Sequence, residues 1–425
     1  MNRLLYSLLF YLAQPLVWLR LAWRARKQPE YLQHIGERYG FYPTKPRAPL
    51  LWLHVVSVGE TRAAEPLIKA LLDEYPEHSL LLTHMTPTGR TTGGELLAKY
   101  GTRLGQAYLP YDLPGACSRF LDHFQPQLGL LMETELWPNL IAAAKQRSIP
   151  LALVNARLSA RSQRGYERFP KLIRPALASL QVVAAQTAAD AERLTAIGAH
   201  NVSTVGNIKF DVTPSLEKKH LGAEWRQTLG KRPIWLAAST REGEEELILD
   251  AFTRIQHPDL LLLLVPRHPQ RFGEVAAMVQ ERKLALCRRS EGSLPTDKTR
   301  VWLGDSMGEM PAYFSVADIA LIGGTLLPFG GQNLIEAAAC GCPVLVGPHT
   351  FNFLQATEDS IACGAAKRVD NADEAASAVE ALLEDREALH AMREAALSFS
   401  QAHRGATART MALIRGVMAR QEIPE

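Results

Sequence analysis

Residues 323–336 read GGTLLPFGGQNLIE, and this stretch decides the fold expected for the chain. The apolar run Ile319–Ile322 comes immediately before it, and residues 337–340 follow with the small side chains of a packed helix. The pattern predicts a buried strand, a glycine-rich turn and a helix start. Glycine lets the backbone approach a ligand closely, and the unpaired N–H groups of a helix's first turn attract phosphate. By itself the stretch predicts an anion held at a helix start.

Two polar residues close this stretch. Asn333 is a plausible N-cap, and Glu336 follows it at the spacing of a capping box. Glu336 therefore has two interpretations, a helix cap or a carboxylate that accepts the two hydroxyls of a ribose. The glycines do not form a dinucleotide-binding fingerprint, and no Walker lysine follows them.

Length and composition predict a folded protein of two domains. The chain has 425 residues, 47% hydrophobic and 21% charged, and its formal net charge is +3. This near balance argues against a dedicated nucleic-acid binder. The five cysteines lack CxxC spacing, as expected of reduced thiols in a cytosolic compartment, and no metal site is expected.

The N-terminal segment 1–27 is predicted to be a membrane-anchor helix with a basic flank. Residues 4–19 are nearly all apolar, and Arg24, Arg26 and Lys27 follow on the side that would stay cytoplasmic. The anchor either spans the bilayer or lies in its interface, with the body of the protein in the cytoplasm. The alternative is a helix packed on its own domain.

Apolar runs and helical patterns alternate along the rest of the chain, which predicts two Rossmann-like, doubly wound α/β domains. The first domain is expected over residues 28–206, a linker over 207–221, and the second domain with its C-terminal helices over 222–425. Two such domains facing across a cleft form the GT-B architecture, with the strand carboxyl ends directed into the cleft. The expected strands are residues 50–56, 80–82, 128–132, 151–154 and 182–185, then 234–238, 260–266, 301–303, 319–322 and 344–346.

Candidate catalytic residues follow strands of the first domain. Glu60 lies where the first strand passes into a helix, and it is either a helix-start carboxylate or a general base. A helix N-terminus lowers a carboxylate's pKa, which opposes the role of base. Glu133 and Glu135 follow another strand as a possible acid pair, of which Glu133 is favoured as functional. Lys209 follows the last strand and could neutralise a phosphate or a carboxylate. His54 is interpreted as a core histidine.

Four loops of the second domain follow strands and therefore share one sheet edge, which favours a nucleotide site. Arg241 and Arg267 suit phosphate contacts, and the segment from Met307 to Met310 could surround a base. Six cations, at positions 157, 161, 164, 168, 171 and 174, would line one face of a helix, although Pro170 argues against an uninterrupted one. This basic stripe is either a solvated face or a surface for anionic lipid.

Taken together, these motifs resemble the bacterial 3-deoxy-D-manno-octulosonic acid (Kdo) transferases of lipopolysaccharide synthesis. The resemblance covers essentially the whole chain. It is carried by residues 57–60 (SVGE), 132–135 (METE), 155–159 (NARLS), 206–209 (GNIK), 267–269 (RHP), 304–306 (GDS), 323–325 (GGT) and 333–336 (NLIE).

The resemblance implies a GT-B, inverting, metal-independent glycosyltransferase without a cofactor. It would move Kdo from CMP-Kdo to the tetraacylated, bisphosphorylated lipid A precursor at the cytoplasmic face of the inner membrane of Gram-negative bacteria. It implies that Glu60 is the base and that Glu133 and Lys209 assist the transition state. The implied CMP-binding residues are Arg267, His268, Met307, Gly308, Glu309, Asn333, Leu334, Ile335 and Glu336.

Two alternatives remain open at the level of sequence. One is a GT-B enzyme acting on a UDP-sugar, such as a peptidoglycan glycosyltransferase or a sugar epimerase. The other is a catalytically inert, membrane-bound nucleotide sensor.

Overall fold

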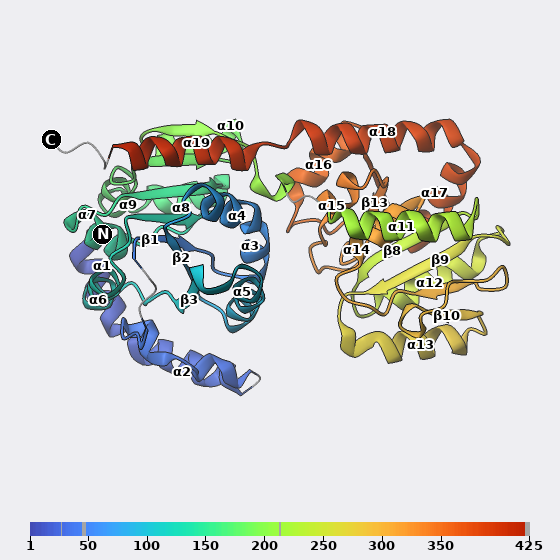
Figure 1. Ribbon diagram of the computed structural model, residues 1–425, viewed down its shortest axis with the longest axis horizontal. Helices are drawn as coiled ribbons and strands as arrows, with labels where there is room; N and C mark the ends of the chain where they lie inside the picture. Colours follow the sequence, from blue (N-terminus) through green and yellow to red (C-terminus); the bar gives the residue numbers. More distant parts are fainter. Residues whose placement is uncertain (27, 45–47, 212–213, 421–425) are drawn as a thin grey trace. The chain divides into compact units, whose positions relative to one another are not determined.

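The computed structural model describes residues 1–26, 28–44, 48–211 and 214–420, and it contains two compact units (Figure 1). The first unit comprises Met1–Val212 and Arg404–Glu425, and the second comprises Thr213–His403. The cleft expected between the two domains stays a prediction. Residues 212–213 of the expected linker and Lys27 of the expected basic flank lie outside the described residues.

The first unit is built on one sheet of seven parallel strands in the order β3-β2-β1-β4-β5-β6-β7. Five strands coincide with predicted runs, whereas β3 and β7 were not predicted. Both have polar residues in their sequences, so neither reads as an apolar run. In chain order the strands are β1 (Leu50–His54), β2 (Ser79–His84), β3 (Leu104–Tyr108), β4 (Leu128–Met132), β5 (Leu151–Ala156), β6 (Val182–Ala185) and β7 (Val202–Thr204).

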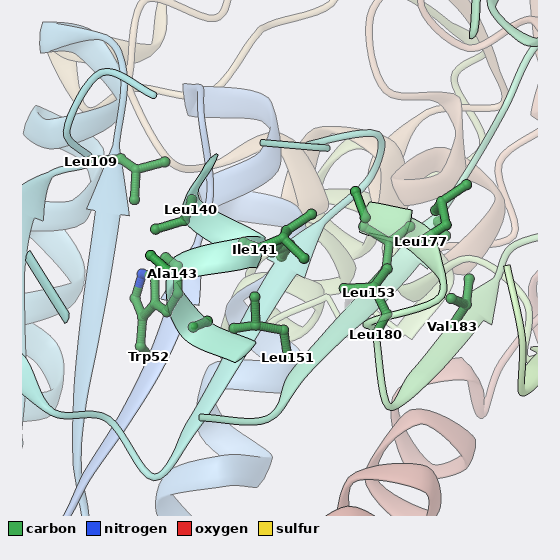
Figure 2. Close-up of a cluster of buried hydrophobic side chains, with 14 of the residues drawn as sticks. Trp52, Leu109, Leu140, Ile141, Ala143, Leu151, Leu153, Leu177, Leu180 and Val183 are labelled. Carbon is green, nitrogen blue, oxygen red and sulfur yellow. The ribbon is translucent and has the colours of Figure 1, made fainter. Parts of the chain in front are cut away.

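Helices cover both faces of this sheet because successive strand side chains point to opposite sides. Trp52 and Leu153 belong to a core cluster with α6, α7 and α9 (Figure 2). Leu51 and Leu53 belong to a second cluster with α4 and α5. The helices are α3 (Val58–Ala63), α4 (Glu65–Glu74), α5 (Pro87–Tyr100), α6 (Pro114–Phe124), α7 (Pro138–Gln146), α8 (Ala160–Glu167), α9 (Pro170–Leu177) and α10 (Ala188–Ala196).

The C-terminal helix α19 (Ala406–Ala419) belongs to the first unit, which corrects the prediction that residues 222–425 form the second domain. Its buried Ile414 and Val417 join the cluster formed by α4 and Ile208. Asp211 accepts hydrogen bonds from the backbone N–H groups of Gly405 and Thr407, and so caps the start of α19. An amphipathic helix shows an apolar face in its sequence, but not which domain that face will contact.

The N-terminal segment forms two helices, α1 (Arg3–Leu12) and α2 (Gln14–Ala25), bent by 50° at their junction. No single helix among the described residues is long and apolar enough to cross a bilayer. The two bent helices together have the length and the apolar composition that a span would need. The Ser7 hydroxyl donates to Asn139 Oδ1 of α7 at 3.0 Å. Leu21 is buried in a cluster with Tyr111 and Leu113. The pair therefore packs against its own unit along one side.

The basic stripe does not lie on one helix. The chain breaks at residues 168–169 between α8 and α9, because Pro170 starts a new helix and cannot continue the previous one. Arg157 lies before α8 and takes part in the site described below.

The second unit repeats the architecture with seven parallel strands in the order β10-β11-β9-β8-β12-β13-β14. The short outer strands β10 and β14 were not predicted. The strands are β8 (Ile234–Thr240), β9 (Leu261–Pro266), β10 (Leu286–Arg288), β11 (Val301–Leu303), β12 (Ile319–Ile322), β13 (Val344–Val346) and β14 (Ala366–Arg368). The helices are α11 (Leu216–Leu229), α12 (Glu244–Arg254), α13 (Phe272–Glu281), α14 (Met310–Val316), α15 (Leu334–Ala339), α16 (Leu354–Ala362), α17 (Ala372–Glu384) and α18 (Arg386–Ala402).

The place of α19 leads to a stability prediction. Ile414 is fully buried, and Ile414→Ala should cost about 3 kcal/mol because it leaves a cavity against the first unit. Native-state hydrogen exchange should show faster opening of β1 and α4, with β8 and β9 unchanged. The exposed Leu216→Ala is the control, and it should change neither unit. If Ile414→Ala loosened the second unit instead, the assignment of α19 would be wrong.

Candidate active site

The candidate site of the first unit lies at the carboxyl ends of adjacent parallel strands. Strand β1 pairs with β4, so Glu60, just after β1, and Glu133, just after β4, reach the same sheet edge. Glu133 and Asn155 both have left-handed backbone conformations, with φ of 60° and 51°. Such conformations are costly for residues other than glycine and often occur at functional sites.

The Glu60 carboxylate is held by two local hydrogen bonds. Its Oε2 accepts from the backbone N–H of Val56 at 2.8 Å, and its Oε1 accepts from the Ser57 hydroxyl at 3.2 Å. Burial raises the pKa of Glu60 from 4.5 to about 7, and the negative charges of Glu133 and Glu135 add to the rise. Burial thus outweighs the lowering expected from a helix start. A carboxylate with this pKa is suited to general base catalysis near neutral pH.

Glu133 forms an ion-pair network with two cations. Its Oε1 lies 3.1 Å from Lys209 Nζ, and its Oε2 lies 3.1 Å from an Arg157 guanidinium nitrogen. The Glu133 side chain is only 9% exposed, whereas that of Arg157 is 52% exposed. The buried carboxylate therefore holds two cations at the sheet edge, one of them open to solvent.

The backbone around Lys209 is fixed by two asparagines. Asn155 Oδ1 accepts from the Ile208 N–H at 3.1 Å, and Asn207 Oδ1 accepts from the Lys209 N–H at 3.0 Å. Asn155 is fully buried at the end of β5. The structure therefore brings Glu133 and Lys209 together, as the sequence predicted, and adds Arg157 and Asn155, to which the sequence analysis gave no role in the site. Arg157 immediately follows β5, and this was the signal that could have identified it.

Glu135 has a different neighbour from Glu133. Its carboxylate Oε2 lies 3.8 Å from His54 Nε2, and His54 Nδ1 lies 2.9 Å from the Thr83 hydroxyl. His54 is fully buried, which confirms its interpretation as a core histidine. The two glutamates therefore have different partners, two cations for Glu133 and a histidine for Glu135.

In the second unit, the glycine-rich loop after β12 is held by a buried carboxylate that sequence reasoning did not single out. Glu244 accepts from the backbone N–H groups of Gly324 at 2.6 Å and Leu326 at 3.0 Å. A Cβ on Gly323 would lie 2.4 Å from the Ser239 carbonyl oxygen, so no larger residue fits. The loop therefore has one packed conformation leading into α15.

The start of α15 agrees with the predicted cap. Asn333 Oδ1 accepts from the Ile335 N–H at 3.0 Å, which confirms Asn333 as the N-cap. Leu334 and Ile335 are each 1% exposed, so only their backbone groups could contact a ligand. Glu336 is half-buried in the first turn of α15.

Cations gather at the carboxyl ends of β8 and β9. Burial lowers the pKa of His268, and the charges of Arg241, Arg267 and Arg271 lower it further. His268 is therefore neutral at physiological pH beside three arginines. Arg271 is paired with the buried Glu245 at 2.8 Å, whereas Arg241 lies over the Phe329 ring at 4.7 Å. This cluster provides positive charge for an anionic ligand.

The loop after β11 presents the residues expected to surround a base. The Met307 side chain is exposed, and Gly308 has a left-handed φ of 76°. Glu309 is paired with Arg289 at 3.0 Å and also accepts from the Ser306 hydroxyl. Burial acts to raise the pKa of Glu309, but these two contacts outweigh it and hold the pKa below its usual value. Glu309 is thus an ionised, well-held acceptor. Within the described residues, no group of three or more His, Cys, Asp or Glu side chains is placed to hold a metal ion.

Comparison with known families defines the class of protein as a glycosyltransferase. Residues 237–399 match the family model described as glycosyl transferases group 1. Residues 33–212 match the model described as 3-deoxy-D-manno-octulosonic-acid transferase.

Full-length relatives specify the family. The chain is 45% identical to a 3-deoxy-D-manno-octulosonic acid transferase of Bordetella pertussis, over 97% of this chain and 98% of the relative. It is 38% identical to a transferase of the same name from Haemophilus influenzae, over 99% and 100% of the two chains. The chain belongs to the 3-deoxy-D-manno-octulosonic acid (Kdo) transferase family.

Solved structures of low sequence identity support the two-unit fold. A UDP-N-acetylglucosamine 2-epimerase from Listeria monocytogenes, described as putative, superimposes with a TM-score of 0.58 at 16% identity, covering 88% of this chain and 98% of its own. A glycosyltransferase from Rickettsia africae gives a TM-score of 0.58 at 13% identity, covering 89% and 99%. At these identities the likeness concerns the fold alone.

The elevated pKa of Glu60 predicts how stability changes with pH. Because the folded-state pKa of about 7 exceeds the usual 4.5, the stability gained from protonated Glu60 is present below pH 4.5 and lost as the pH rises to 7. Glu60→Gln keeps a neutral side chain at every pH. Its free energy of unfolding should therefore rise relative to the parent's between pH 4.5 and 7, and the difference should then stay constant.

Urea denaturation at a series of pH values measures this difference. The exposed Glu95→Gln is the matched control, and it should show no dependence in the same interval. A stability difference that did not change between pH 4.5 and 7 would mean that Glu60 ionises normally.

Proposed function

We propose that this Kdo transferase moves Kdo from CMP-Kdo to the tetraacylated, bisphosphorylated lipid A precursor, with inversion and without a metal. The observation that carries the proposal is the partly buried Glu60 carboxylate, whose pKa is about 7, beside the Glu133–Lys209 pair. Family membership supports the sugar that is moved. The acceptor and the localisation at the cytoplasmic face of the inner membrane are part of the proposal.

In the proposed reaction, Glu60 takes the proton from an acceptor hydroxyl. The hydroxyl oxygen attacks the anomeric carbon of Kdo, and the bond from that carbon to the phosphate oxygen of CMP breaks with its electron pair on CMP. Attack opposite the leaving group inverts the anomeric centre. Lys209 and Arg157, held by Glu133, would stabilise the charge of the Kdo carboxylate.

The second unit is proposed to bind the donor. Arg241 and Arg267, with neutral His268 beside them, would contact the phosphate of CMP. Backbone N–H groups at the start of α15 would donate hydrogen bonds to cytidine or its ribose, and the carboxylates of Glu309 and Glu336 would accept hydrogen bonds from them. Fixed cations would then supply the leaving-group stabilisation that a metal ion supplies in other transferases.

The proposed base gives a prediction for transfer. Glu60→Gln should lower the rate of Kdo transfer by about 10³-fold, because the amide cannot accept the proton. The parent's rate should fall about tenfold per pH unit below pH 7, as the ionised fraction of Glu60 falls. The assay incubates protein with CMP-Kdo and lipid A precursor, and mass spectrometry of the lipid detects and counts the added sugars.

The nucleotide control separates this proposal from an enzyme that uses a UDP-sugar. CMP should raise the melting temperature of both the parent and Glu60→Gln, whereas UMP and UDP should not. Near-normal turnover by Glu60→Gln would rule out Glu60 as the base. Stabilisation by UDP alone would rule out CMP-Kdo as the donor. CMP binding without any transfer by the parent would indicate a nucleotide sensor.

We further propose that the α1–α2 pair attaches the protein to the membrane by lying in its interface. Exposed apolar residues recur every three or four positions along both helices, at Leu4, Leu8, Leu12, Leu16, Leu19 and Trp23. This spacing places them on one face, which we call the apolar stripe. The opposite side packs on the first unit through Ser7 and Leu21. A helix pair with one packed face and one apolar face suits interfacial insertion.

The membrane proposal predicts that Leu8→Glu with Leu12→Glu abolishes sedimentation with anionic liposomes, because two charges would enter the acyl region. The fold should be kept, because both side chains are about half or more exposed. The matched control is Leu216→Glu with Leu354→Glu in the second unit, both also exposed. Equal loss of binding in the two double variants would contradict a role for the apolar stripe.

A further inference from the structure

Two grooves meet on the outer face of the first unit, away from the residues proposed for catalysis. The first has a volume of about 480 Å³ and lies among α1, α7 and α9. The second has a volume of about 490 Å³ and reaches the end of α19. Lys145, Ala178 and Ser179 line both grooves, so the two adjoin, and we treat them as the two halves of one depression. Each volume lies within the usual range of small-molecule sites.

The two grooves differ in chemistry. The first is lined mainly by apolar residues, of which Ala142 and Pro175 are accessible, whereas Leu172 and Ala176 expose only their edges. Beneath them Ile141 belongs to the buried cluster of Figure 2. The second is more polar and includes Arg420 and Ser148. Among the described residues, the lining includes the cations Arg3, Lys145, Lys171 and Arg420 but no carboxylate. The depression is therefore amphipathic, with positive charge where the two halves meet.

Two cations of this depression have no ion-pair partner among the described residues. Within the described parts of the chain, neither Lys145 nor Arg420 takes part in an ion pair, although nearby Arg147 is paired with Asp122 at 2.8 Å. Lys145 lies in the last turn of α7, which runs from the carboxyl end of β4 back to the start of β5. Lys145 is therefore near the sheet edge opposite to that of Glu60. The depression is separate from the site of transfer.

We propose that this depression, which we call the α7 groove, binds one anionic phospholipid of the surrounding membrane. Its phosphate would contact Lys145 and Arg420, and one acyl chain would lie on Ala142, Pro175 and the exposed edge of Leu172 toward α1. Charge complementarity selects an anionic headgroup, and the apolar floor selects a lipid over free phosphate. The inference rests on the proposed membrane attachment, because a membrane supplies the lipid. It assigns the groove to a bystander lipid and not to the acceptor.

The test measures binding of a soluble, short-chain lipid to the full chain by native mass spectrometry and calorimetry. Dioctanoyl phosphatidylglycerol should bind with a stoichiometry of one, and dioctanoyl phosphatidylcholine should bind about tenfold more weakly. Lys145→Glu with Arg420→Glu should weaken phosphatidylglycerol binding about tenfold or more. The matched control is Arg161→Glu with Arg164→Glu on α8, which carries the same charge change outside the groove and should alter binding less than about twofold.

A second variant tests the apolar half without changing charge. Ala142 is half-buried and lines the first groove, so Ala142→Phe should fill it and weaken lipid binding. Circular dichroism checks the fold of each variant. If Ala142→Phe does not fold, the double variant Lys145→Glu with Arg420→Glu still tests the proposal. Equal effects of the two charge reversals, or equal binding of both lipids, would overturn the proposal. Displacement of the phospholipid by inorganic phosphate alone, or by the lipid A precursor at equal affinity, would also overturn it.

Because binding is measured without donor or turnover, failure of this proposal can be told apart from failure of the proposed transfer. Lipid binding at the α7 groove with no Kdo transfer would leave the inference standing. Kdo transfer without phospholipid binding would overturn this inference and leave the proposed transfer standing.

Discussion

The parallel direction of every strand pair is the constraint on which the rest of each unit depends. Both seven-stranded sheets are wholly parallel, so all strand carboxyl ends reach one edge of their sheet. In the first unit this edge brings Glu60, Glu133 and Lys209 together from segments far apart in the chain. In the second it gathers the glycine-rich loop and the arginines around His268. The candidate functional residues of each unit therefore lie at one edge of its sheet.

The glutamates at these edges differ in their electrostatic environments. Glu133 is buried but paired with two cations, whereas Glu60 is partly buried with only local hydrogen bonds and like charges nearby. Burial without a cation favours the neutral acid, so the pKa of Glu60 rises to about 7. In the second unit, Glu244 is kept in place by backbone N–H groups and stabilises a loop. Similar side chains therefore differ in environment: one is a carboxylate of raised pKa, one holds two cations, and one supports a loop.

Local patterns predicted much of the candidate site, and their failures have physical causes. Strand ends located Glu60, Glu133 and Lys209, and capping preferences located Asn333. The same patterns suggested a lowered pKa for Glu60, because the helix start is a local feature and burial is not. Arg157 was interpreted as part of a surface stripe, since its ion pair with Glu133 joins the ends of two neighbouring strands and is not visible in the local pattern. The edge strands β3, β7, β10 and β14 were missed because they lack continuous apolar runs.

The sequence by itself determined the fold class, most of the central strands and the motifs of the Kdo transferase family, because periodicity, glycines and caps act within a few residues. Only the tertiary structure decided what depends on distant contacts. It assigned α19 to the first unit through Ile414 and Asp211, bent the N-terminal segment into two helices, and formed the α7 groove. It also set the pKa of Glu60. An apolar face or a carboxylate is visible in sequence, but its partner and its solvent exposure are not.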